Sequence, residues 1–167
     1  MRAFRVTSLL LLTILVLALG AGAASAKRAG TVDKVTGEFM YTRPAGTSWW
    51  DLAVHESAPA KGYVHLSRAL VDGSEPEVLW AVRYVRIEGN EAWFAGVRLY
   101  DNLGTVGSWT VFHVIDPGGP ADDGDVFQYT WQSITEDQAR IAVETWTAPD
   151  LMRSTPFDEG NVNVHVY

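Results

Sequence analysis

Four aspartates crowd one short segment rich in glycine and proline, DPGGPADDGDVF, which runs from residue 116 to residue 127. Asp116, Asp122, Asp123 and Asp125 could offer several carboxylate oxygens to calcium, which binds oxygen ligands on adaptable loops. Their spacing does not match an EF-hand. Aspartates in such segments also bond to nearby backbone amides and so shape a solvent-exposed turn. Both interpretations stay open, a calcium-stabilised module and an acidic turn, and we prefer the turn.

A second candidate site lies in GTSWWDLAVHE, residues 46–56. On a helix Asp51 and His55 would be adjacent and could exchange a proton. The alternation of apolar and polar residues instead predicts a strand, in which these two residues would be about 13 Å apart. Trp49 would then face away from Trp50, and an exposed indole there could stack on a sugar or an apolar ligand. The alternative is that Trp49 packs against a neighbouring loop or inside a filled barrel.

Motifs for known catalytic chemistry are missing from the sequence. It has no cysteine, no Gly-x-Ser-x-Gly elbow and no glycine-rich phosphate loop, and its four histidines do not pair at metal-ligating spacings. We therefore assign no catalytic residue and expect a non-enzymatic module. The alternative is a hydrolase or isomerase with a site in the mouth of a barrel, which would use His65, His113 and nearby acids.

The N-terminus has the pattern of a secretory signal peptide. Arg2 and Arg5 precede an uncharged apolar run over residues 6–20, and Ala24-Ser25-Ala26 has the small-x-small form of a cleavage site. We predict cleavage after residue 26, which leaves a single domain over residues 27–167. The apolar run is short for a membrane span, which needs about 20 residues. We expect no integral membrane segment after processing, and the alternative is an uncleaved anchor.

The charge and composition of the chain disfavour some classes of binding partner. The processed chain would keep all 20 acidic residues and 11 of the 13 basic ones, for a net charge of −9. Such a chain is not expected to bind nucleic acid or an anionic membrane surface. Without cysteine the fold must be held by burial alone, so most of the seven tryptophans and six tyrosines are expected in the core.

Apolar and polar residues alternate along most of the chain, which predicts half-buried strands. Gly89-Asn90 is a two-residue hairpin turn, and a change of phase near residues 83–85 indicates a bulge. We predict an all-β fold, an about eight-stranded antiparallel barrel or alternatively a two-sheet sandwich. The expected strands lie near residues 35–41, 49–55, 62–70, 78–88, 91–100, 108–116, 127–133 and 161–167.

One segment, near residues 136–146, has helical rather than strand periodicity. Thr135 and Gln138 have the spacing of a capping box, and residues 151–160 after the helix are expected to form an ordered surface loop. A competing interpretation as a strand would use Ile141, Val143 and Thr145. The expected buried stripe of the helix consists of Ala139, Ala142, Val143 and Trp146.

Several short segments together resemble the post-COAP-like group of small, secreted bacterial all-β domains. They are TGEF (36–39), KGYVHLSR (61–68), EGNEAWFAGV (88–97), WTVFHVIDPGGP (109–120), DGDVF (123–127) and EGNVNVHVY (159–167). The resemblance implies one exported antiparallel domain and a structural role for the acidic loop. That group has no established activity, so it implies no catalytic residue. We therefore expect a bacterial module, secreted or associated with the cell wall, that binds a small molecule, a glycan or a protein.

Overall fold

The structure, a computed structural model, describes residues 32–102, 104–118, 124–155 and 157–167. They belong to one compact unit, Val32–Tyr167. The predicted signal peptide, Asp122 and Asp123 lie outside the described residues, so export stays a prediction. Within the described ranges no helix has the length and hydrophobicity needed to cross a bilayer.

The strands form a single antiparallel sheet in the order β8-β7-β6-β5-β4-β3-β2-β1-β9. Consecutive strands are neighbours from β1 to β8, and the last strand returns to pair with the first. The sheet therefore begins and ends on edge strands that come from the C-terminal part of the chain. The strands are β1 (Lys34–Arg43), β2 (Gly46–His55), β3 (Lys61–Leu70), β4 (Glu77–Glu88), β5 (Glu91–Asp101), β6 (Trp109–Ile115), β7 (Val126–Thr130), β8 (Met152–Thr155) and β9 (Glu159–His165).

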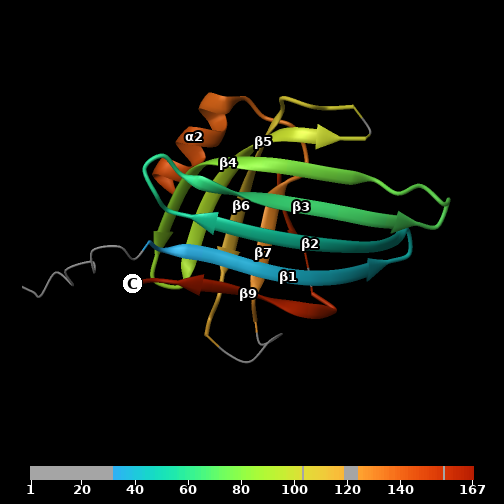
Figure 1. Cartoon of the computed structure of the whole chain (residues 1–167), viewed down its shortest axis with the longest axis horizontal. Coiled ribbons are helices and arrows are strands. Elements are labelled where there is room, and N and C mark those ends of the chain that lie inside the picture. Colours follow the sequence, from blue (N-terminus) through green and yellow to red (C-terminus); the bar gives the residue numbers. More distant parts are fainter. Residues whose placement is uncertain (1–31, 103, 119–123, 156) are drawn as a thin grey trace, which may run out of the picture. The chain divides into compact units, whose positions relative to one another are not determined.

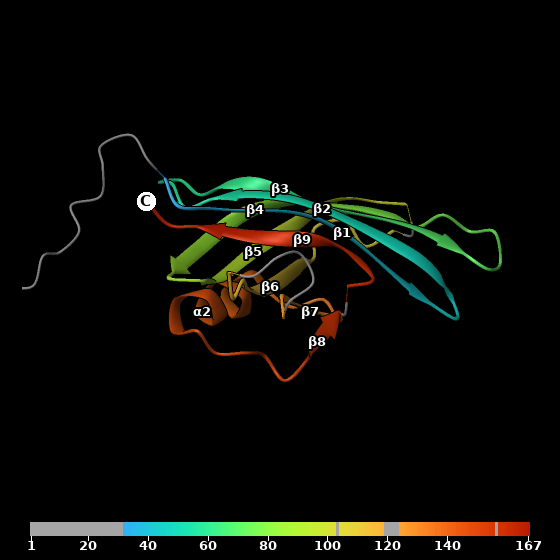
Figure 2. The same cartoon turned by 90° about the horizontal axis from the view of Figure 1, so that it is seen from below.

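The sheet curls into a half-barrel. β1, β2, β3 and β9 run across the front of Figure 1, and β6 and β7 cross behind them. Turned by 90°, the same strands form an upper and a lower layer, joined through β4 and β5 (Figure 2). The predicted all-β, barrel-like fold with one short helix is confirmed, with nine strands among the described residues where about eight were expected. The alternative of two separate sheets is wrong, because all nine strands belong to one sheet.

The main hydrophobic core fills the concave side of the sheet. Successive residues of a strand face opposite sides, so Trp50, Leu52 and Val54 of β2 are buried while Trp49 and His55 are exposed. Phe94, Phe112 and Phe127 are fully buried on the far layer. Four of the seven tryptophans are buried, but of the six tyrosines only Tyr41 is, so the expectation that most of these rings lie in the core holds for tryptophan and is wrong for tyrosine.

The predicted helix is α2 (Glu136–Thr145), and its capping box is present. The Thr135 side chain accepts a hydrogen bond from the Gln138 amide, and the Gln138 side chain accepts one from the Thr135 amide. The helix ends at Trp146, which has a left-handed conformation with φ 54°. It covers the outer side of β4, β5 and β6. The predicted stripe is confirmed, since it packs in a second cluster with Trp93, Trp109 and Val111.

Two details of the predicted strands are confirmed and three differ. The Gly89-Asn90 hairpin joins β4 to β5, and a register shift between Val82 and Tyr84 is the expected bulge. The expected surface loop at 151–160 is wrong at both ends, because β8 forms over Met152–Thr155 and pairs with β7, and β9 already begins at Glu159. β7 ends at Thr130 rather than continuing to residue 133, and Val166 lies beyond β9 with half of its surface exposed.

Candidate functional site: an arginine pocket

A hollow of about 390 Å³ opens at one end of the half-barrel, where β1 and β3 end and β2 and β4 begin. This end lies on the right of Figure 1. Four arginines from four different strands line the hollow, which we call the arginine pocket: Arg43 of β1, Arg68 of β3, Arg98 of β5 and Arg153 of β8. One carboxylate, that of Asp101, also lines it. The lining thus has an excess of positive charge, although the chain as a whole carries a net charge of −7.

Strand alternation explains why the arginines converge. Arg68 follows the buried Val64 and Leu66 of β3 at two-residue steps, so it faces the same concave side. Arg43 continues the buried positions of β1 in the same way. Arg153 lies opposite Tyr129 in the pairing of β7 with β8. In each case the arginine occupies an inward position where the hydrophobic core ends and the mouth of the half-barrel begins.

Arg98 is held by a salt bridge that also lies in the pocket. Its Nη1 atom donates to Oδ2 of Asp101 at 2.7 Å, and the guanidinium lies 5.3 Å from the ring of Trp80. Both side chains are well buried, with 17% and 4% of their surface exposed. A register shift beside Trp80 brings Asp101 opposite Val78, a concave-facing position. The charge of Arg98 is therefore largely balanced by Asp101.

Two other arginines lie over aromatic rings at the rim. The guanidinium of Arg153 lies 4.1 Å from the centroid of Trp131, and that of Arg43 lies 4.9 Å from Tyr41. Stacking of this kind fixes the plane of a guanidinium group while leaving its edge available to an anion. Arg43, Arg153 and Trp131 are all exposed, so this part of the pocket is open to solvent.

Three nitrogen atoms of the pocket residues are buried without a hydrogen-bond partner among the described residues. They are Nε1 of Trp50, Nε of Arg68 and Nε of Arg98. A buried donor left unpaired costs about 1–3 kcal/mol, and such atoms are rare in folded proteins. All three are donors. A bound molecule that satisfied them would have to supply acceptors, such as the oxygens of an anion.

Two tyrosines complete the pocket and add further donors. Burial raises the pKa of Tyr129, and the neighbouring Tyr41 phenol adds to this effect through its charge and a hydrogen bond; Arg68 and Arg43 oppose it. A raised pKa means that the Tyr129 phenol keeps its proton at neutral pH. It can therefore still donate a hydrogen bond. The ring of Tyr129 lies 5.1 Å from that of Trp50, which forms part of the pocket floor.

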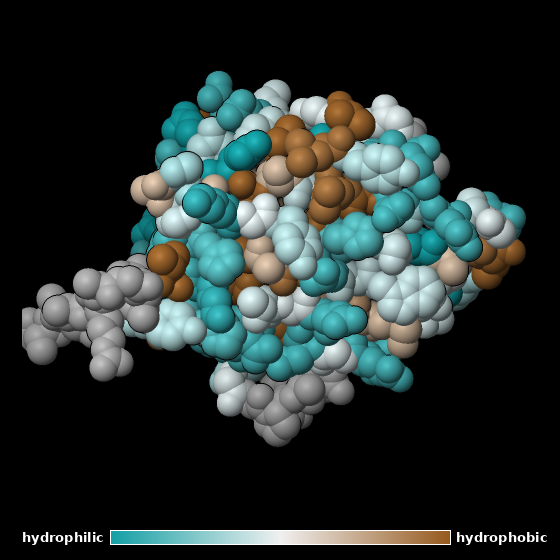
Figure 3. Space-filling model, in the orientation of Figure 1, coloured by the Kyte–Doolittle hydropathy of each residue, from teal (hydrophilic) through white to brown (hydrophobic). Residues whose placement is uncertain are grey.

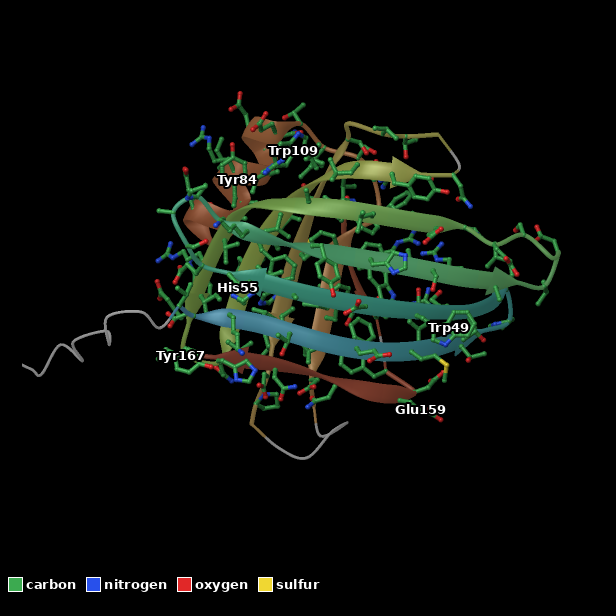
Figure 4. All side chains as sticks on the ribbon, viewed as in Figure 1. Trp49, His55, Tyr84, Trp109, Glu159 and Tyr167 are labelled. Carbon is green, nitrogen blue, oxygen red and sulfur yellow. The ribbon has the colours of Figure 1, made fainter. Side chains whose placement is uncertain are left out.

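The predicted candidates in residues 46–56 lie away from this pocket. Trp49 is 43% exposed on the outer face of β2, opposite in direction to the buried Trp50. Figure 4 shows Trp49 and His55 at opposite ends of the strand, and the segment is a strand as predicted. Asp51 accepts a hydrogen bond from the Tyr63 hydroxyl at 3.0 Å. The face of the molecule seen in Figure 3 is mostly teal and pale with several brown patches, and a stacking role for Trp49 stays a prediction.

The two histidines considered for an enzyme also lie outside the arginine pocket. His65 on the outer face contacts Glu77, with 3.0 Å between Nε2 and Oε1. His113 is stacked on Trp93 with ring centroids 4.1 Å apart, and its ring nitrogens contact Glu91 and Gln128. Trp93 belongs to the cluster under α2, so His113 lies on the helix-covered side of the sheet. Each histidine thus contacts a glutamate outside the arginine pocket, and a catalytic role for either one stays a prediction.

Two of the four acidic-loop residues bind the edge strand β9. Asp116 Oδ2 accepts a hydrogen bond from the amide of Val164 at 2.9 Å, and Asp125 Oδ2 accepts one from Val162 at 3.0 Å. Asp116 Oδ1 also accepts from the Gly118 amide at 2.8 Å, as in an acidic turn. These carboxylates occupy amides of an edge strand that would otherwise be unpaired. Among the described residues no three potential ligand side chains gather as a metal site, and calcium stays a prediction that involves Asp122 and Asp123.

Replacing Asp116 with alanine is expected to lower the free energy of unfolding by about 1–3 kcal/mol, because it removes the acceptor from a partly buried strand amide. Urea unfolding measures this loss. Asp72→Ala is the matched control. The Asp72 carboxylate also accepts a hydrogen bond from the backbone amide two residues later, that of Ser74, but it bonds to no distant strand. An equal loss in both variants would contradict a role for Asp116 in holding β9.

Sequence reasoning missed the arginine pocket. The four arginines are spread over residues 43–153 and form no motif. One signal was available in the sequence, the alternation of inward and outward residues along a strand. On β1 and on β3 an arginine occupies the next inward position after a series of inward hydrophobic residues. Comparisons with protein-family models, with curated proteins and with solved structures give no match for this chain.

Proposed function

We propose that this protein is a non-enzymatic module that binds a small anionic ligand in the arginine pocket. The observation that supports it best is the set of three buried, unpaired donors on Trp50, Arg68 and Arg98. A ligand with carboxylate, sulfonate or phosphate oxygens would supply the acceptors that these donors lack. Binding would replace unsatisfied buried groups with charge-assisted hydrogen bonds.

The local charge supports the same proposal. Four arginines and one aspartate give the pocket lining a formal charge of +3, whereas the whole chain has −7. A concave surface lined by one sign of charge concentrates small ions of the opposite sign. The acidic remainder of the surface disfavours large polyanions, so the anion has to be small enough to enter the mouth of the half-barrel.

Arg68→Gln is the substitution that tests the proposal. Loss of a charge-assisted hydrogen bond costs about 1.5–3 kcal/mol, so affinity for a pocket anion is expected to fall at least about tenfold. The measurement is a ¹H–¹⁵N NMR titration with 2-naphthoate, naphthalene-2-sulfonate and inorganic phosphate. Arg83→Gln is the matched control, because Arg83 is an exposed arginine of β4 outside the arginine pocket. If none of the three anions shifts the pocket signals of the unmutated protein, the proposal fails.

A second candidate is a stacking site for a glycan or an apolar ligand on Trp49, supported by the exposure of that ring. A Trp49→Ala variant separates the two sites. It should leave anion binding unchanged if the arginine pocket is the site, and weaken glycan binding if the outer face is used. The hydrolase or isomerase alternative gains no support from His65 or His113, since neither lines the pocket.

We further propose that the protein acts outside the cytoplasm, secreted or associated with a bacterial cell wall. The signal-peptide pattern of residues 1–26 supports this placement. A small anionic ligand met there would be taken from the surroundings of the cell. N-terminal sequencing of protein exported from a bacterial host would check it, with Lys27 as the expected first residue.

A further inference from the structure

We infer that the ligand of the arginine pocket is a compact aromatic carboxylate, with its carboxylate at Arg68 and its flat body against the tryptophans that line the pocket. The inference rests on the proposed function, since it names the ligand class of that site. Three features of the pocket support this ligand class. Its walls are aromatic, its donors are planar guanidinium groups of which one is balanced by Asp101, and its floor is closed.

Aromatic rings form much of the pocket wall. Trp50 and Trp80 lie parallel on the floor, with centroids 6.1 Å apart and an interplanar angle of 12°. Tyr129 is tilted against Trp50, and Trp131 lies at the rim under Arg153. Rings favour flat partners in offset or edge-on contact. A planar body would gain more contact with these walls than a flexible or strongly hydrated group.

The donors match a carboxylate. A guanidinium is planar and pairs with both oxygens of a carboxylate through two parallel hydrogen bonds. Many phosphate sites instead use backbone amides at a helix N-terminus, and α2, the one helix of the described residues, covers the outer face of the sheet rather than the pocket. Asp101 balances Arg98, so the inner pocket is left with the charge of Arg68. That charge matches a monoanion rather than a multiply charged phosphate.

The floor of the pocket is closed, which limits the length of the ligand. Behind Trp50 the concave side is filled by Phe39 and Phe127, whose rings lie 6.1 Å and 5.0 Å from that of Trp50. Phe112 and Phe127 are fully buried, so this interior is packed. A volume of about 390 Å³ is at the small end of ligand sites, which span about 300–1,000 Å³. A one- or two-ring acid fits such a space, whereas a long acyl chain would have to extend into solvent.

The test is a calorimetric titration of the purified, unmutated protein with five probes. 2-Naphthoate has both the flat aromatic body and the single carboxylate of the inferred ligand. Of the other probes, 2-naphthalenemethanol lacks the negative charge and acetate lacks the aromatic ring. Inorganic phosphate carries more negative charge, and dodecanoate has a long flexible chain. We expect 2-naphthoate to bind most tightly, at least about tenfold more tightly than its neutral analogue, since a charge-assisted bond is lost. Tighter binding of phosphate or of dodecanoate would overturn the inference and leave the proposed function standing. Binding by no anion would refute both.

A pair of tryptophan variants tests where the ring lies. Trp131 and Trp49 are similarly exposed, at 46% and 43%, but only Trp131 lines the pocket. Trp131→Ala is expected to weaken 2-naphthoate binding about 2- to 10-fold, the range of one aromatic contact, and Trp49→Ala should leave it unchanged. The Trp50 indole proton should move downfield in NMR spectra on binding. Equal effects of the two variants, or an unmoved Trp50 signal, would argue against the inferred position.

Discussion

Phe127→Ala is expected to lower the free energy of unfolding by about 3–5 kcal/mol, the usual cost of a large cavity in a packed core. Phe127 is fully buried, and its ring contacts those of Phe39, Trp50 and Phe112 at 4.9, 5.0 and 5.9 Å. It thus joins the two layers of the curled sheet, with β1 and β2 on one side and β6 on the other. Loss of this ring leaves a space that no single neighbour can fill.

Urea unfolding, followed by tryptophan fluorescence, measures this loss. Phe127→Leu is the control, because it keeps most of the apolar volume and should cost less than half as much as alanine. The Phe127 ring also supports the pocket floor through Trp50, so a folded alanine variant should bind 2-naphthoate more weakly than the leucine variant does. If alanine costs under about 1 kcal/mol, Phe127 is not the central contact between the layers.

Local periodicity was enough to predict most of the fold from the sequence. The alternation of Trp49 and Trp50 predicted which ring is buried, and the structure agrees. Thr135 and Gln138 predicted the beginning of α2, and Gly89-Asn90 predicted the hairpin between β4 and β5, because caps and two-residue turns depend only on neighbouring residues. β8 was missed because four residues, MRST, are too few to show a period.

The candidate site was harder to predict because it depends on contacts between distant residues. Arg68 and Arg153 come together only when the sheet curls, and neither belongs to a motif. Asp116 and Asp125 looked like candidate metal ligands because they crowd one loop. Their role as acceptors for Val162 and Val164 requires that β9 return to the first strand, which the spacing of the aspartates does not reveal.

The pairing of β2 with β3 brings the central donors of the pocket together, and Gly62 tests that pairing. Trp50 lies opposite Leu66 and Ser48 lies opposite Arg68, so Trp50 and Arg68 are diagonal neighbours on adjacent strands. Further along the same pair, Gly62 lies opposite Val54 with φ +144°. A Cβ there would come within 2.7 Å of the Val54 Cα and closer still to the Ala53 carbonyl oxygen. Both obstacles are backbone atoms, so no change of rotamer relieves them.

Gly62→Ala is therefore expected to lower the free energy of unfolding by about 2–6 kcal/mol, from an unfavourable φ together with overpacking. Gly73→Ala is the matched control, because Gly73 also has a positive φ, +83°, but nothing lies within 4 Å of its Cβ position. It should cost only about 1–2 kcal/mol. Thermal and urea unfolding of both variants measure the difference. If the two alanines cost the same, β2 and β3 do not approach at Gly62 as described, and the position of Trp50 beside Arg68, on which the anion site depends, would lose its support.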